Sequence, residues 1–65
     1  MEEKDKQIKM LENEIEELTY NIETCEEHIA RLPEGAARSQ FEEDRADLMK
    51  ELDGLKRKLA ALQTP

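Results

Sequence analysis

Aromatic side chains are almost absent from this 65-residue sequence: there is no tryptophan, one tyrosine (Tyr20) and one phenylalanine (Phe41). Charged residues instead make up 42% of the chain, with glutamate, lysine, leucine and alanine prominent. This composition is typical of coiled coils and long helices rather than of globular enzymes. We therefore expect a non-enzymatic protein with no cofactor, no metal ion and no small-molecule substrate.

Cysteine and long apolar runs are also scarce. Cys25 is the single cysteine, which excludes an internal disulfide, and a lone thiol is typical of a reducing compartment. The first residues contain no apolar segment of the signal-peptide kind, and no run approaches the roughly 20 apolar residues of a membrane-spanning helix. These absences predict a soluble, cytoplasmic protein.

Positive charge is in deficit, because 17 acidic residues oppose 10 lysines and arginines and leave a net charge of −7. An acidic surface repels the phosphate backbone of nucleic acids and anionic membrane surfaces. We expect no direct binding to either, with an acidic mimic of nucleic acid as a minor alternative.

Glycine and proline are missing before residue 33, and this long stretch carries the strongest pattern. Its apolar residues recur at alternating steps of three and four, which is the a/d heptad repeat of a coiled coil. They are Ile8, Leu11, Ile15, Leu18, Ile22, Cys25, Ile29 and Leu32. The repeat predicts a helix over about residues 4–32 with one narrow apolar stripe.

A Pro-Glu-Gly segment at residues 33–35 then interrupts the helix. The residue before a proline avoids the helical conformation and glycine accepts positive φ, so we predict that α-helical structure stops near Leu32 and that residues 33–37 form a turn. Ser39, followed three residues later by Glu42, resembles a capping box. The second helix is expected over about residues 38–63.

The second helix carries a stripe of its own in a different phase, with Arg45 in the one heptad position that lacks an apolar residue. Its members are Phe41, Leu48, Leu52, Leu55, Leu59 and Leu62. If Gly35 is the centre of the turn, facing positions add to 70 and Ile22, for example, faces Leu48. The sequence therefore predicts an all-α, antiparallel coiled-coil hairpin, with residues 1–65 as one domain.

Charges beside the stripes favour the same arrangement. The basic run at residues 56–58 comes to face the acidic segment 12–17, and His28 is expected near Asp44. Glu26 beside Glu42 is the one repulsive pair. Each exposed pair contributes only about 0–1 kcal/mol, but such charges select the orientation of coiled-coil helices.

Two helices of this length enclose a small core. We therefore expect a homodimer that forms a four-helix bundle, or a hairpin that relies on a helix of another protein. Several apolar residues outside the stripes could build a second seam: Met10, Ala46, Met49, Ala60 and Ala61. The candidate partner contacts are Tyr20, because exposed aromatic residues are enriched at hot spots, together with Arg45 and Met49.

Cys25 and His28 lie three residues apart on the first helix and are the nearest approach to a metal-ligand pair. One such pair falls short of a zinc signature. We interpret Cys25 as a small core residue at a d position and predict no metal site.

The segment from Leu55 to Leu62 is that of a generic leucine-rich coiled coil. In architecture, the predicted hairpin resembles the N-terminal coiled coil of hantavirus nucleocapsid proteins and the small helical co-chaperones of type III secretion needle subunits. A likeness of fold does not fix function, and no site residue is carried over. We expect a protein–protein interaction and oligomerisation module; the alternative is a small chaperone or regulator that shields a partner's amphipathic helix.

Overall fold

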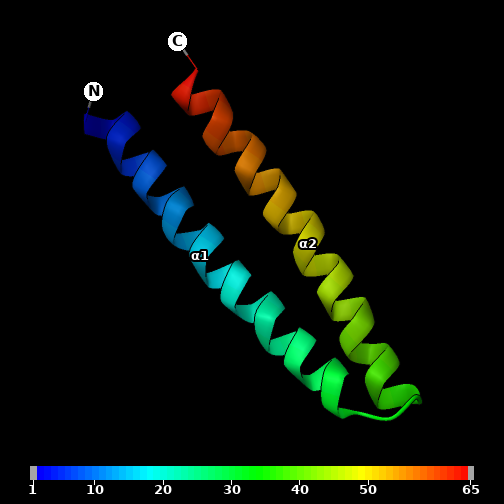
Figure 1. The fold of residues 1–65 in the computed structure, drawn as a ribbon. Helices are drawn as coiled ribbons and strands as arrows, with labels where there is room; N and C mark the ends of the chain where they lie inside the picture. The colour runs from blue at the N-terminus through cyan, green and yellow to red at the C-terminus, as the bar shows by residue number, and fades with distance from the viewer. Residues whose placement is uncertain (1, 65) are drawn as a thin grey trace.

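The computed structural model describes residues 2–64, which form two antiparallel α-helices joined by a short bend (Figure 1). Helix α1 spans Glu2–Arg31 and helix α2 spans Ala36–Gln63. The molecule is a rod that measures 50 × 14 × 12 Å along its principal axes. The predicted all-α hairpin is confirmed, and each helix begins two residues before its predicted start. Neither helix, over the residues described, is long and apolar enough to cross a membrane.

Helix α1 ends where the sequence predicts. Leu32 still donates its backbone N–H to the carbonyl of His28 at 3.0 Å, but Pro33 has no N–H with which to continue the ladder. The ring of a proline also disfavours helical geometry at the preceding residue. For these two reasons the last helical residue of α1 is Arg31.

The start of α2 depends on the backbone of Gly35 rather than on a side-chain cap. Gly35 has φ 157° and ψ −173°, a conformation that is essentially restricted to glycine. Its carbonyl accepts the first helical hydrogen bond, from the N–H of Ser39 at 3.0 Å. Ser39 consequently lies inside the first turn of α2, and the predicted capping box with Glu42 is wrong.

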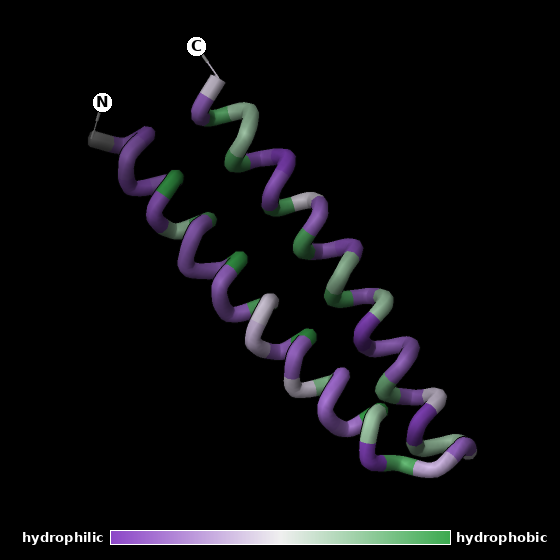
Figure 2. Tube along the Cα trace, in the orientation of Figure 1, coloured by the Kyte–Doolittle hydropathy of each residue, from purple (hydrophilic) through white to green (hydrophobic). Residues whose placement is uncertain are grey.

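The apolar stripes of the two helices face each other along the rod (Figure 2). The structure places thirteen of the fourteen stripe residues in a half-buried environment, while Ile22 is buried with 8% of its surface exposed. Ile22 is the only buried residue among those at positions 3–64. Each helix covers one side of the other, so the seam between them stays open along both edges.

Candidate interaction surface

Two contacts between the helices define how they face each other. The ring of His28 stacks on that of Phe41, with 4.6 Å between ring centroids and 14° between ring planes. Farther from the bend, Arg45 forms an ion pair with Glu26 at 2.9 Å. In both pairs the residue numbers add to within one of 70, as a bend centred on Gly35 requires.

One edge of the seam carries a groove made of two adjoining hollows. Its central part is lined by Glu14, Glu17, Leu18, Asn21, Glu51, Gly54, Leu55 and Lys58. The part nearer the chain ends is lined by Gln7, Met10, Leu11, Glu14, Lys58, Ala61 and Leu62. Because Glu14 and Lys58 line both parts, we treat them as one feature and call it the leucine groove.

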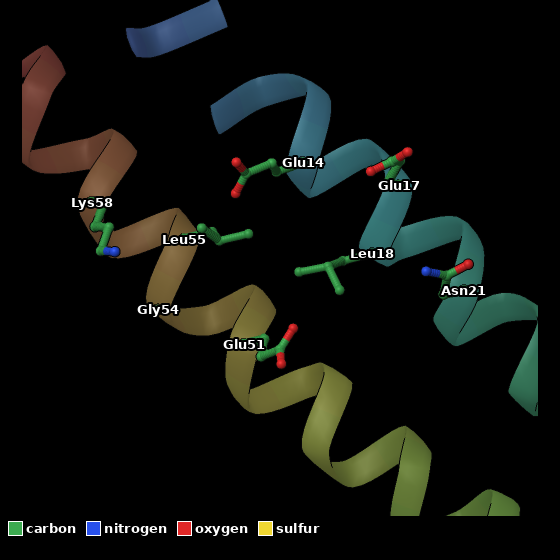
Figure 3. A pocket seen from close by; sticks show the side chains of 8 residues that line it. All are labelled: Glu14, Glu17, Leu18, Asn21, Glu51, Gly54, Leu55 and Lys58. Atoms are coloured by element: carbon green, nitrogen blue, oxygen red, sulfur yellow. The ribbon is translucent and has the colours of Figure 1, made fainter. Parts of the chain in front are cut away.

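The floor of the leucine groove is apolar and its rim is charged. Leu18 and Leu55 point toward one another between the helices, and the carboxylate of Glu14 reaches from α1 toward α2 (Figure 3). Gly54 leaves open space, since a Cβ built there would meet no atom within 4 Å. Met10, at the outer end, is 62% exposed. Such a surface suits apolar side chains that come from another helix.

Heptad geometry explains why this edge is lined by leucines. Its four leucines occupy d positions, which lean toward one edge of an antiparallel pair, while a positions lean toward the other. The hollow on the opposite edge accordingly contains a-position residues, and it is lined by Glu26, Ile29, Ala30, Glu42 and Arg45. The two edges therefore differ in the residues that line them.

Arg45 closes the gap in the stripe of α2 by binding across to α1. Its Nε and Nη2 atoms both donate to Oε2 of Glu26, at 3.0 and 2.9 Å. The side chains keep 38% and 48% of their surface exposed, so the ion pair sits at the edge of the seam. The sequence predicts Glu26 beside Glu42, and both line the same hollow. The Arg45–Glu26 pair is an addition to that prediction, and its signal in the sequence is that an a position also borders an e position of the facing helix.

Near the bend, the ring of His28 stacks on Phe41. Oδ1 of Asp44 accepts a hydrogen bond from Gln40 at 3.1 Å, and the expected proximity of His28 and Asp44 stays a prediction. Cys25 is a free, half-buried thiol in the seam. Within the part of the chain that the structure describes, no group of three or more His, Cys, Asp or Glu residues could hold a metal ion.

No protein-family model, curated protein or solved structure matches the chain.

The three candidate partner contacts lie in different places. Tyr20 is 70% exposed on α1 and lines a hollow that adjoins the leucine groove. Met49 is 45% exposed at an e position, on the edge opposite the leucine groove. Arg45 is engaged with Glu26. A contact of these residues with a partner stays a prediction.

Proposed function

We propose that this hairpin is a non-enzymatic protein–protein assembly module. Helices of a partner polypeptide cover the apolar residues that the two helices leave partly exposed. The observation that carries the proposal is the exposure of the seam. Of the fourteen apolar residues that form it, Ile22 alone is buried. Covering apolar surface stabilises a protein by about 25 cal/mol per Å². Burial of these half-exposed residues would therefore contribute substantially to the free energy of binding a partner.

The total surface supports the same proposal. The chain exposes 5372 Å², whereas a folded monomer of 7.6 kDa typically exposes about 4,300 Å². The excess of about 1,100 Å² exceeds the roughly 800 Å² that each partner contributes to a standard protein–protein interface. An interface of ordinary size therefore fits on this rod.

The chemistry of the surface favours a protein partner. The leucine groove is lined by leucine side chains, Met10 and Ala61 and has a charged rim. Protein interfaces show the same pattern of an apolar core with a polar rim. The acidic middle of the rod repels nucleic acid phosphates. Cys25, a free thiol, suits a reducing compartment such as the cytoplasm.

The proposal is tested by photo-crosslinking in cells that make the chain. Benzoylphenylalanine replaces either Ala61, which lines the leucine groove, or Arg57, whose side chain is 81% exposed at an outward-facing f position. We expect covalent adducts to a polypeptide from position 61 and few from position 57. Equal yields from the two positions, or no adduct from position 61, would overturn the assembly function.

Irradiation at successive times after synthesis of the chain separates the assembly role from the chaperone alternative. An adduct of the same mass at every time supports an assembly module. An adduct that no longer forms once the partner has joined its own complex would instead support a chaperone that shields an amphipathic helix.

A further inference from the structure

The identity of the partner can be inferred from the way charge is distributed along the rod. We propose that the partner is a second copy of this chain, bound in antiparallel orientation through the leucine groove, so that each helix packs against its own copy. This inference rests on the proposed function and adds to it the partner, the surface and the alignment.

The rod has a basic end, opposite the bend, while the rest of it is acidic. Residues 2–10 and 54–64, at the end opposite the bend (Figure 1), carry six basic and three acidic side chains, a net charge of +3. Residues 11–53 carry four basic and fourteen acidic side chains, a net charge of −10. Two copies that lie side by side in the same direction place acid against acid. Two copies in opposite directions place the basic end of each against the acidic part of the other, which is the favourable arrangement.

Charge also selects the edge through which the copies meet. On the edge opposite the leucine groove, the b and e positions of α1 hold a row of acids: Glu12, Glu16, Glu23 and Glu26. An antiparallel contact of α1 with its copy along that row would bring Glu12 against the partner's Glu26. The corresponding c and g positions on the groove side hold Glu14 and Glu17 followed by Asn21, Thr24, His28 and Arg31. On α1, the groove side therefore carries fewer acidic residues than the opposite edge.

The alignment follows from the groove residues. Asn21 and Glu51 line the groove from opposite helices. Both are labelled in Figure 3, at the end of the groove nearer the bend. On α2, Lys58 and Asp44 lie seven residues on either side of Glu51. A two-fold axis at this level consequently sets Lys58 against the partner's Asp44.

The same axis arranges α1 in the same way. Glu14 and His28 lie seven residues on either side of Asn21, so Glu14 meets the partner's His28, whose ring can donate an N–H. The two copies of Glu51 meet on the axis itself, beside the Asn21 amides. The leucine edges of both grooves are covered at the centre of the contact.

The test uses charge reversal in the full chain, read by sedimentation velocity and by far-ultraviolet circular dichroism. Lys58→Glu or Asp44→Lys alone creates two repulsive pairs in the dimer and should weaken it by roughly tenfold or more. An equimolar mixture of the two variants has attractive pairs at both places, so it should form a heterodimer with nearly wild-type affinity. Residues 44 and 58 are about 21 Å apart along α2, so this rescue arises only between chains.

Matched controls place the same charges elsewhere. Lys56→Glu makes the same change two residues away at an e position, and Glu43→Lys mirrors Asp44→Lys at an outward f position. Both controls should dimerise like the wild type. Glu51→Gln should tighten the dimer, since it removes the repulsion on the axis.

Each outcome is decisive. A wild-type chain that stays monomeric at about 100 μM, or a variant mixture that forms no heterodimer, overturns the inference. If the monomeric chain nevertheless yields photo-adducts to a different protein from position 61, the assembly function stands and only the self-partner falls. If both experiments fail, both proposals fall.

Discussion

At the scale of single residues, the least predictable feature is the pairing of Arg45 with Glu26. The gap in the stripe at position 45 is evident from the sequence, and the stripe alone does not say where a long cationic side chain turns. The structure resolves this, because both donor atoms reach one carboxylate oxygen across the seam. With both side chains partly exposed, this pair contributes about 0–1 kcal/mol.

Arg45→Leu is therefore expected to raise the free energy of unfolding by about 0.5–1 kcal/mol, since half-burial of a leucine outweighs the lost ion pair. Thermal and urea unfolding, monitored by circular dichroism at fixed protein concentration, measure the change. Glu26→Gln serves as the control, because it removes the ion pair without filling the stripe, and should lower stability slightly. A marked loss on Arg45→Leu would show that the ion pair dominates.

Gly35→Ala should destabilise the hairpin by about 1–3 kcal/mol, because alanine is strained at the φ and ψ of Gly35. The added Cβ meets no atom within 4 Å, so the cost comes from the backbone alone. The melting temperature should fall by at least roughly 4 °C. Gly54→Ala, within α2 and equally open, is the matched control and should gain up to about 1 kcal/mol. An unchanged melting temperature for Gly35→Ala would contradict this account of the bend.

At the scale of the helices, the apolar pattern was sufficient to predict most of the structure. The alternating steps of three and four predict two helices, and the Leu32–Pro33 pair predicts where α1 ends. The start of α2 was not predictable from Ser39 and Glu42, because a glycine conformation rather than a side-chain cap sets it. Local backbone geometry of this kind leaves little trace in a hydrophobic pattern.

Ile22→Asp tests the packing of the helices at the most buried position, where 8% of the side chain is exposed. Loss of the isoleucine and burial of a carboxylate together should cost more than about 3 kcal/mol, which is a large fraction of the stability of so small a chain. The helical signal at 222 nm should largely disappear. Tyr20→Asp introduces the same carboxylate at a site that is 70% exposed and should keep its helicity. Full helicity in Ile22→Asp would contradict the central place of this residue.

At the scale of the whole molecule, the sequence predicts that the chain folds back on itself. It does not directly show which residues gather at each edge of the helix pair. That grouping depends on which heptad positions lean to which side once the helices are antiparallel. Only the assembled pair brings Leu18, Leu55 and Lys58 to a common groove. The candidate surface was therefore visible in the sequence as scattered apolar residues, without their grouping.

Energy transfer between two dyes tests whether the chain folds back on itself in solution. In a Cys25→Ala background, dyes at Lys9→Cys and Gln63→Cys should transfer energy efficiently, because antiparallel helices lie about 8–10 Å apart. An uninterrupted helix would separate these positions by about 81 Å. Dyes at positions 9 and 34 are the internal control, at about 38 Å in either arrangement. Dilution with unlabelled chain removes transfer between copies, and weak transfer for the first pair would exclude the hairpin.

The four-residue connection between Arg31 and Ala36 also determines how α1 and α2 respond to dilution. While the backbone is intact, the effective concentration of one helix around the other is of the order of millimolar. A chain severed between Glu34 and Gly35 would lose that advantage, and its two fragments would have to find each other by diffusion. A single peptide bond at the tip of the rod thus determines whether pairing of the helices is intramolecular or bimolecular.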